Sequence, residues 1–370
     1  MEDYKYLTIV EWVKDYIVSH GLKPNDRFLT EKELCSIHGV SRQTVRQALM
    51  QLERDNILCR MRGSGTFVKN AVSPAYNNGR NIGVISTYFS DYIFPHIVTG
   101  IESVLNDASC PMQIAITHNR AAEETQALKS MLLNGVRGLI IEPSKSALPN
   151  PNIELYREIQ RSNIPVVFFN AKYPWADDMP CVALDDEAAG RMVTDYLFSC
   201  GHSRIAGVFL MDDIQGHKRY GGFINSCMAH GSRDSEKNVI WYTSAEKDDP
   251  FSGAKSRMLE LLDRVTAVVC YNDMIAVKLM QFCRDNGISI PDDVSVTGID
   301  DSSYAPICEV PLTTVKHPLR RLGEAAAHAL LGLIATGSRS QEDIIFAPEL
   351  VIRDSVKVLR SDEMNEIRMA

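Results

Sequence analysis

The spacing of apolar and polar residues changes near residue 80 of this 370-residue chain. Beyond that point, short apolar runs alternate with segments in which apolar residues recur at helical spacing. The apolar runs cover residues 82–86, 114–117, 138–141, 165–169, 182–184, 205–210, 267–270 and 294–298. The helical segments cover residues 97–105, 123–133, 188–198, 222–228, 253–262 and 274–283. Alternating buried strands and helices predict an α/β domain with a parallel sheet, and eight or more strands could form one barrel or two open sheets.

The N-terminal 69 residues have a different pattern, in which three helical segments precede two short β-like runs. The helices are expected over residues 6–20, from Thr30 onward and from Ser41 onward, and the β-like runs cover residues 57–61 and 66–68. Glu33 lies three residues after Thr30, as in a capping box, and Ser41 is a good N-cap. This layout is that of a winged helix-turn-helix. A solvated amphipathic helix beside an ordinary hairpin would give the same pattern.

Residues 70–80 contain Pro, Asn and Gly and have no apolar periodicity, which predicts an interdomain linker. The predicted organisation is therefore a winged helix-turn-helix over residues 1–69, the linker, and a larger α/β region over residues 81–370.

Charge distinguishes the two regions. Residues 41–69 carry six basic and two acidic side chains, a net charge of +4, within a chain whose net charge is −8. Residues 1–40 carry −2, so about −10 remains beyond residue 70. A basic patch on the third helix and the hairpin fits a phosphate-binding surface, whereas the acidic remainder is a poor nucleic-acid binder.

Composition argues against several other classes of protein. The N-terminus has no basic and apolar segments of a secretory signal, and no apolar run approaches the length of a membrane span. Nine scattered cysteines without a C-x-x-C pair indicate reduced thiols, and neither a disulfide framework nor a zinc site. We therefore expect a cytoplasmic protein without a membrane partner.

Residues 30–68 contain TEKELCSIHGVSRQTVRQALMQLERDNIL and then RGSGTFV, which resemble the DNA-binding domain of GntR-type bacterial repressors. That family has a Thr/Ser-Glu opening to its second helix, a VSRxTVRxAL recognition helix and a G-x-G-T-F wing. The resemblance implies operator DNA as a partner. The residues expected at the DNA, including the helix-capping Ser41, are Glu31, Ser41, Arg42, Thr44, Arg46, Arg62, Gly63 and Gly65.

The remainder contains NIGVIST, GHSRIAGVF, YNDMIAVKLM and VSVTGIDDS, which resemble the effector domains of LacI/GalR-type repressors. These domains are built like periplasmic sugar-binding proteins. The resemblance implies two Rossmann-like lobes with parallel sheets, a ligand in the cleft between them, and the main surface for a homodimer. Lobe one is then expected over about residues 81–171 and 301–317, and lobe two over about residues 172–300 and 318–360.

A GntR-type head on a LacI-type effector domain is the arrangement of the arabinose repressors of Gram-positive bacteria. The stretches STYFSDYIFPHIVTGIES, EPSKSALPNPNI, DDIQGHKRYGGF and LTTVKHP resemble that group. The resemblance implies L-arabinose as the effector and no cofactor. Arg62 stands where a neutral amide is common in the group, which leaves the operator preference open. The residues alone leave other pentoses, hexoses, their phosphates or a purine as alternatives.

Ligands of open α/β sheets bind outside the carboxyl ends of strands, and many polar residues here directly follow predicted strands. Carboxylates and Arg suit sugar hydroxyls, because a hydroxyl both donates and accepts hydrogen bonds. The predicted ligand residues are Tyr92, Glu142, Lys145, Asn170, Asp185, Gln215, Arg219, Asn272, Asp273, Asp300 and His317, with Glu142, Arg219 and Asp273 ranked highest. For Asp273 the alternative is a helix cap, and for His317 a buried structural histidine.

Two other classes of function fit the sequence less well than a sugar-responsive repressor does. No Walker loop, G-x-S-x-G elbow, H-E-x-x-H or kinase signature occurs, so an enzyme would depend on a carboxylate pair such as Glu142 with Asp273 for glycoside hydrolysis. A sugar sensor that binds a protein partner would not need the basic helix and hairpin. A transcriptional repressor accounts for both regions.

Overall fold

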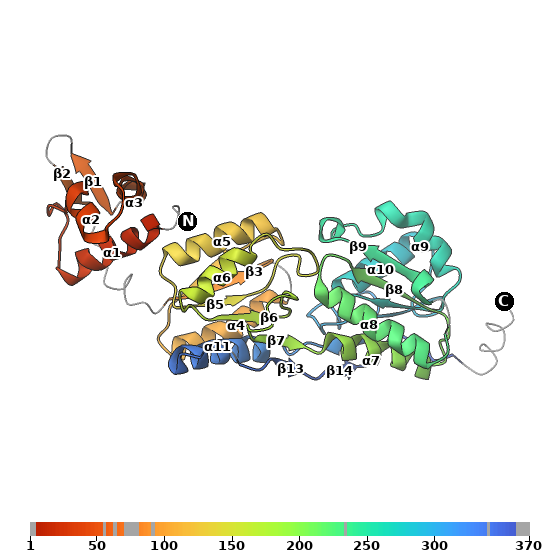
Figure 1. The fold of residues 1–370 in the computed structure, drawn as a ribbon. Helices are drawn as coiled ribbons and strands as arrows, with labels where there is room; N and C mark the ends of the chain where they lie inside the picture. Colours follow the sequence, from red (N-terminus) through yellow and green to blue (C-terminus); the bar gives the residue numbers. More distant parts are fainter. Residues whose placement is uncertain are drawn as a thin grey trace. The chain divides into compact units, whose positions relative to one another are not determined.

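The computed structural model describes residues 5–54, 57–61, 65–69, 81–89, 93–232, 235–338 and 341–359. The chain forms two compact units (Figure 1). One is centred on the N-terminal helices and hairpin. The other holds the chain from residue 84 onward, apart from segments 109–113 and 128–137. The predicted linker, residues 70–80, lies outside the described residues.

The N-terminal unit contains three helices followed by an antiparallel hairpin. These elements are α1 (Lys5–Ser19), α2 (Glu31–His38), α3 (Arg42–Arg54), β1 (Leu58–Met61) and β2 (Gly65–Val68). Val13, Leu34 and Leu49 bring the three helices into one apolar core. Thr30 and Glu33 form the predicted capping box at the start of α2, and the backbone N–H of Thr30 donates to Glu33 at 2.7 Å. The predicted winged helix-turn-helix is confirmed.

The first sheet of the larger region has six strands in the order β13, β7, β6, β5, β3, β4. Its strands are β3 (Ile82–Ser86), β4 (Met112–Ile116), β5 (Gly138–Ile141), β6 (Val166–Phe169), β7 (Cys181–Leu184) and β13 (Ile344–Phe346). The accompanying helices are α4 (Phe94–Asp107), α5 (Ala121–Leu133), α6 (Ile153–Arg161) and α11 (Leu319–Thr336). The pairs β13·β7, β7·β6 and β6·β5 are parallel, and β5, β6 and β7 are buried throughout. Burial on both faces explains why these strands appear in the sequence as continuous apolar runs.

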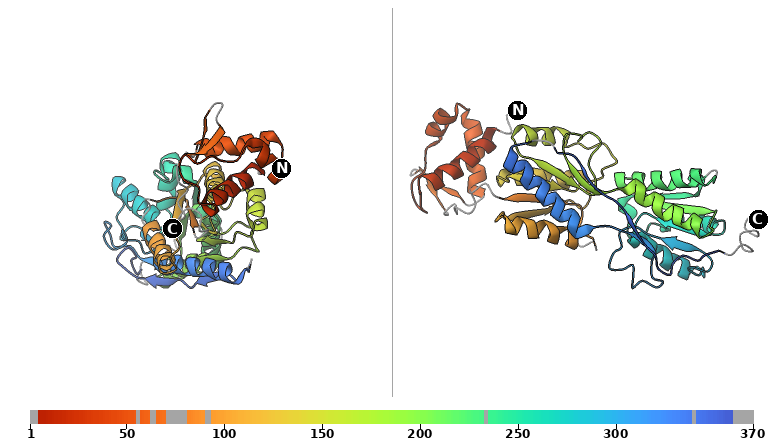
Figure 2. Two further views of the ribbon diagram at one scale, coloured as in Figure 1. Left: turned by 90° about the vertical axis from the view of Figure 1, so that its left-hand side faces the viewer. Right: turned by 90° about the horizontal axis from the view of Figure 1, so that it is seen from below.

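The second sheet has four parallel strands in the order β11, β10, β8, β9. These are β8 (Ile205–Leu210), β9 (Val239–Tyr242), β10 (Ala267–Cys270) and β11 (Ser295–Thr297). One face packs on α7 (Asp186–Ser199) and α8 (Ile214–Ala229), and the other on α9 (Lys255–Leu262) and α10 (Asp273–Asp285) (Figures 1 and 2). Two open parallel sheets replace the barrel alternative, and the two-lobed fold class is confirmed.

The chain passes between the two sheets three times. It leaves the first sheet between β7 and α7, returns between β12 (Thr314–Lys316) and α11, and crosses again between β13 and β14 (Glu349–Val351), which pairs with β12. The predicted lobe limits were therefore wrong for β7, β13 and α11, which belong with the first sheet: β7 pairs with β6 and β13, and α11 packs on α4. They were also wrong for residues 301–317, which were expected in lobe one, because Leu312 and Val315 pack into the cores of the second half. The order of strands in a sheet depends on partners that are distant in sequence, so it cannot be predicted from local periodicity.

In each half, one pair of helices meets closely through glycines. Between α7 and α8, a Cβ at Gly190 would lie 2.1 Å from Arg219 O, and one at Gly222 would lie 2.0 Å from Glu187 O. The helices α4 and α11 use Gly100 and Gly323 in the same reciprocal way. Backbone approach this close leaves no room for a side chain, so these positions require glycine.

Candidate functional site

A cavity of about 190 Å³ lies where the carboxyl ends of strands from both sheets come together. It is lined by Thr87, Tyr88, Ile93, Phe94, Asn119, Glu142, Pro143, Ala171, Leu210, Asp213, Gln215, Tyr242, Ser244, Lys247, Asp248, Tyr271, Asn272, Met274, Ile275 and Lys278. The lining combines aromatic rings with carboxylate, amide and hydroxyl groups. A concave, partly polar space of this kind fits one small polar ligand.

Glu142 is the buried carboxylate of this wall and directly follows β5. Its Oε2 accepts from the backbone N–H of Thr87 at 2.8 Å and from the Thr87 hydroxyl, and its Oε1 accepts from Asn170 Nδ2 at 2.8 Å. Burial raises the pKa of Glu142 to about 7, against the lowering effect of these donors. The side chain is thus held rigidly and is poised to be either charged or neutral near neutral pH.

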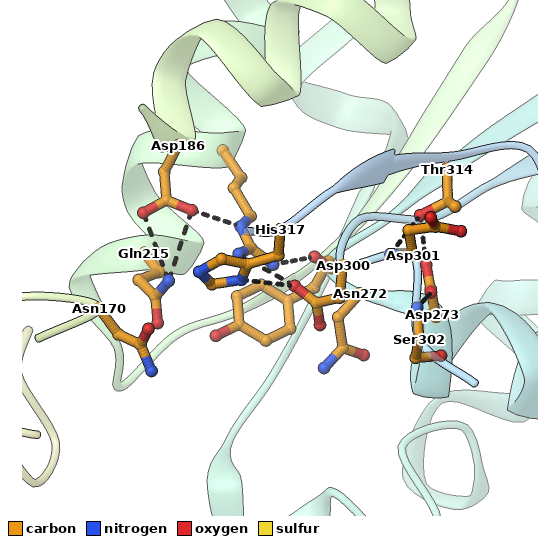
Figure 3. A network of polar contacts seen from close by, with 12 residues as sticks. Asn170, Asp186, Gln215, Asn272, Asp273, Asp300, Asp301, Ser302, Thr314 and His317 are labelled. Atoms are coloured by element: carbon orange, nitrogen blue, oxygen red, sulfur yellow. Dashed lines mark hydrogen bonds and ion pairs between the residues drawn. The ribbon is translucent and has the colours of Figure 1, made fainter. Parts of the chain in front are cut away.

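A second buried network surrounds Arg219, and Figure 3 labels its partners Asp186 and Asp300. Its Nε donates to Asp186 Oδ1 at 2.8 Å, its Nη1 donates to Tyr271 O at 2.6 Å, and its Nη2 lies 3.5 Å from Asp300 Oδ1. The guanidinium also lies over the Tyr271 ring, 4.8 Å from the centroid. Although burial opposes it, Asp186 and Asp300 raise the pKa of Arg219, so the cation is fixed. Burial raises the pKa of Asp186, which the Arg219 cation opposes.

Gln215 connects this network to the cavity wall, and two further polar side chains, Asn170 and His317, lie nearby. Gln215 Nε2 donates to Asp186, and the His317 Nδ1 atom lies 3.4 Å from Asp300 Oδ1. Within the described part of the chain, Asn170 Oδ1 and His317 Nε2 are buried without a hydrogen-bond partner. Figure 3 draws Asn170 beside Gln215, which lines the cavity. Buried polar atoms of this kind are costly unless a water or ligand satisfies them.

Of the predicted ligand residues, Glu142, Gln215 and Asn272 line the cavity. Four others lie behind that lining. Asn170 bonds Glu142 and Arg219 bonds Tyr271, while Asp300 contacts Arg219 and His317 contacts Asp300. Tyr92 lies outside the described residues. Seven of the eleven predicted ligand residues therefore line the cavity or belong to the networks around Glu142 and Arg219.

Three of the predicted ligand residues point elsewhere. Asp273 is buried, and its carboxylate accepts from the backbone N–H of Ser302 at 2.7 Å and from the Thr314 hydroxyl. Asp185 caps α7 by accepting from Ala188 N at 3.0 Å, and Lys145 lies 3.6 Å from Asp212. None of the three lines the cavity, since a position after a strand does not determine the direction of a side chain. For Asp273, this means that the high rank given to it as a ligand residue was wrong.

The exposed face of α3 is the candidate DNA surface. A groove of about 740 Å³ is lined there by Tyr6, Arg42, Gln43, Arg46, Gln47, Met50, Gln51 and Arg54. The Arg46 side chain is 60% exposed and pairs with Glu31 at 3.0 Å, while Arg60 on β1 pairs with Glu31 at 3.2 Å. Glu31 therefore connects α2, the recognition helix and the hairpin. An exposed row of Arg and Gln suits phosphate and base-edge contacts in a major groove.

Other predicted DNA residues have structural roles or lie outside the described residues. Ser41 caps α3, since its Oγ accepts from Thr44 N at 3.2 Å. The Thr44 side chain is buried, and its Oγ1 lies 2.9 Å from Ser41 Oγ, so the expectation that it faces DNA is not met. Gly65 begins β2 at φ 118°, where glycine is favoured. Arg62 and Gly63 lie outside the described residues.

Two family models match the chain, one on each region. The model of the bacterial regulatory proteins of the gntR family covers residues 5–68, and that of the periplasmic binding protein-like domain covers residues 194–356. The arabinose metabolism transcriptional repressor of Geobacillus stearothermophilus is 40% identical over 95% of this chain and 98% of its own length. The chain belongs to this family of transcriptional repressors.

Two further comparisons support the assignment of this repressor. The arabinose metabolism transcriptional repressor of Halalkalibacterium halodurans is 35% identical over 97% of the chain and 98% of its own length. The crystal structure of the transcription regulator GntR from Chromobacterium violaceum is 28% identical, with a TM-score of 0.64 over 75% of this chain and 99% of that one. Among the described residues of the repressor, no helix is long and apolar enough to cross a membrane.

Sequence reasoning missed several residues that line the repressor's cavity. Asp213 begins α8 as its N-cap, and Tyr242 and Tyr271 stand at the ends of β9 and β10. Asp213 carried the same signal as Asp185, a carboxylate between a strand and a helix, and could have been included on that ground. Lys247 lies over the Tyr88 ring, 3.7 Å from its centroid, and nothing in its local sequence indicates that position.

Proposed function

We propose that this repressor binds operator DNA as a homodimer and is released from it by a small sugar, L-arabinose. The observation that carries the proposal is the cavity of about 190 Å³, whose lining combines buried carboxylate and amide groups with aromatic rings. Rings can cover the C–H face of a sugar while the polar groups bond its hydroxyls. The choice of L-arabinose rests on the names of two relatives that are 40% and 35% identical to the chain.

The cavity chemistry explains how a sugar would be selected. Glu142, Asp213 and Asn272 offer acceptors, while Gln215 and Asn272 also offer amide donors. A buried acceptor that loses its partner costs free energy, so analogues that lack a hydroxyl are rejected. The glycoside-hydrolase alternative paired Glu142 with Asp273, but Asp273 does not line the cavity and accepts from Ser302 and Thr314. The proposed repressor would return the sugar unchanged.

Dimer formation is part of the proposal because one recognition helix covers only a half-site. Two-fold proteins bind palindromic operators with two heads, each placing a helix in the major groove. The basic and amide side chains on α3 supply those contacts, and the two-sheet region supplies the sugar response. A cytoplasmic location follows from this role.

Thermal melting of the purified repressor with a panel of sugars tests the effector. A ligand that binds only the folded state raises the melting temperature by mass action. L-arabinose should raise it, while D-arabinose and a purine should not. A shift with another sugar would keep the mechanism and change the effector, whereas no shift with any sugar would refute carbohydrate sensing.

The DNA-binding role is tested by Arg46→Gln in operator titrations at several salt concentrations. Loss of one phosphate or base contact should weaken binding about tenfold or more, and loss of a phosphate contact should reduce the salt slope by about 1. Sugar binding should be unchanged, because Arg46 lies on the N-terminal unit. Lys129→Gln, at an exposed position of α5, is the control. Unaltered operator affinity in Arg46→Gln would refute the assigned DNA surface.

A further inference from the structure

Two loops meet beside the cavity, one after β5 in the first half and one after β8 in the second. Ser146 Oγ, in the first loop, donates to Asp213 Oδ1 at 2.6 Å and accepts from the backbone N–H of Ile214 at 2.9 Å. Ser146 is 1% exposed. Since Ile214 is the first residue of α8, a serine from one half caps a helix of the other half.

Asp213 connects this contact to the cavity wall. Its Oδ1 also accepts from Gln215 N at 3.2 Å, and its Oδ2 accepts from the Tyr271 hydroxyl at 3.0 Å. Asp213, Gln215 and Tyr271 all line the cavity, whereas Ser146 does not. One carboxylate therefore serves the helix end, the cavity wall and the opposite loop together.

The surroundings of this contact are polar as well. Asp212 accepts from Ser244 through the backbone N–H at 2.9 Å and through the hydroxyl, and its backbone oxygen accepts from Ala147 N at 3.4 Å. Lys145 pairs with the same carboxylate at 3.6 Å. Each of these groups can bond water when the loops separate, so a single bond contributes little net free energy. Such a contact opens readily unless another interaction favours the closed arrangement.

We propose that Ser146 and Asp213 form a latch that holds the two halves around a bound sugar. Ser146 is then a positioning residue for the effector, although it does not touch it. Asp213 links the latch to the ligand, because the same carboxylate lines the cavity. The proposal rests on the proposed function in so far as a sugar fills this cavity, and it adds the residues that keep the sugar enclosed.

Ser146→Ala tests the latch through the kinetics of sugar binding. L-arabinose affinity should fall about five- to tenfold, and the loss should appear as faster dissociation in stopped-flow fluorescence, with the association rate little changed. Ser199→Ala is the control, because the Ser199 hydroxyl donates only within its own helix, to Tyr196 O at 2.6 Å. Wild-type affinity and dissociation rate in Ser146→Ala would overturn the proposal.

A double-mutant cycle separates a latch from a general structural role. If Ser146 and Asp213 act through one bond, Asp213→Ala should weaken sugar binding by a smaller factor in the Ser146→Ala background than in the wild type. Factors that simply multiply would overturn the proposal. Circular dichroism melts of all variants establish that each protein is folded at the temperature of the titration.

Amide hydrogen exchange keeps the latch testable if no sugar binds. The N–H of Ile214 donates to Ser146, so in the ligand-free repressor it should exchange faster in Ser146→Ala than in Ser199→Ala. Failure of the wild type to bind L-arabinose would refute the proposed effector, and the exchange rate at Ile214 would then be the test of the latch. Equal exchange at Ile214 in both variants would overturn the latch.

Discussion

At the scale of single residues, we expect the largest loss of stability when the buried Arg219 is replaced. Asp186 and Asp300 are both buried beside it and have its guanidinium between them. Arg219→Met keeps much of the side-chain volume but leaves two buried carboxylates without their cation. The free energy of unfolding should fall by about 3–5 kcal/mol, measured by urea denaturation. Arg191→Met, at an exposed position of α7, should change it by less than about 0.5 kcal/mol.

The same variant also tests the site. Arg219 supports the Tyr271 ring and the Asp186 partner of Gln215, so sugar binding should be lost even where the protein remains folded. A variant that is as stable as the wild type, or that binds sugar normally, would show that the network contributes neither to stability nor to the cavity.

Glu142 should make stability depend on pH in a defined direction. Its pKa is raised to about 7 in the folded protein from an ordinary value of 4.5, so folding favours the protonated form. The resulting stabilisation is complete below pH 4.5 and is lost as the pH rises through 7. It amounts to roughly 3 kcal/mol. In Glu142→Gln this loss is absent, so its unfolding free energy should rise relative to the wild type between pH 5 and pH 8.

Urea denaturation of both proteins across that pH range measures the effect. Asp273, whose pKa burial also raises to about 7, is present in both proteins, so its contribution cancels in the difference. A difference that is constant with pH would mean that Glu142 titrates in the folded protein as it does in the unfolded chain.

Two neighbouring residues also show how far the site could be predicted from the sequence. Asn272 and Asp273 are adjacent after β10, yet Asn272 lines the cavity and Asp273 points to Ser302. Their position was predictable, because the carboxyl ends of parallel strands are known from strand direction. Their side-chain directions were not, because these depend on the loop carrying Ser302, which is distant in sequence.

At the scale of elements, the paired glycines permit a matched comparison. Gly190→Ala would place a methyl group against Arg219 O and separate α7 from α8, which costs about 1–3 kcal/mol of unfolding free energy. Gly323→Ala causes the same kind of clash between α11 and α4, against Ile97 O. Both variants should lose similar stability. Only Gly190→Ala should also weaken sugar binding, by about tenfold, because it displaces the backbone of Arg219.

Calorimetric titration of both variants with L-arabinose at a temperature where each is folded distinguishes the two effects. Equal sugar affinity in the two variants would mean that the α7–α8 spacing does not control the position of Arg219.

Elements with strong local signals were predicted, and those defined by distant partners were not. The strands β3, β5, β8 and β10 match their apolar runs, because burial on both faces requires such runs. The three-residue strands β12, β13 and β14 are too short to show a period and exist through pairing alone. The sequence pattern also did not predict the helices α6 and α11. Only the packing of α11 on α4 shows that α11 belongs to the first lobe.

At the scale of the whole molecule, the proposed mechanism requires operator DNA and sugar to oppose each other. If the sugar favours an arrangement of the two halves in which the heads are badly placed for the operator, it lowers operator affinity by some factor. Thermodynamic linkage then requires the operator to lower sugar affinity by the same factor, since both ligands act on one equilibrium. A coupling free energy of about 1–3 kcal/mol corresponds to roughly 5–150-fold.

Two titrations measure this coupling from opposite sides. Fluorescence anisotropy gives operator affinity with and without saturating L-arabinose, and calorimetry gives sugar affinity with and without an operator duplex. The two factors should agree. Arg46→Gln, studied at an operator concentration that leaves it unbound, should bind sugar as the free wild type does. Equal sugar affinity of the free and operator-bound repressor would refute release by the sugar, because a ligand with the same affinity for both states cannot shift the equilibrium between them.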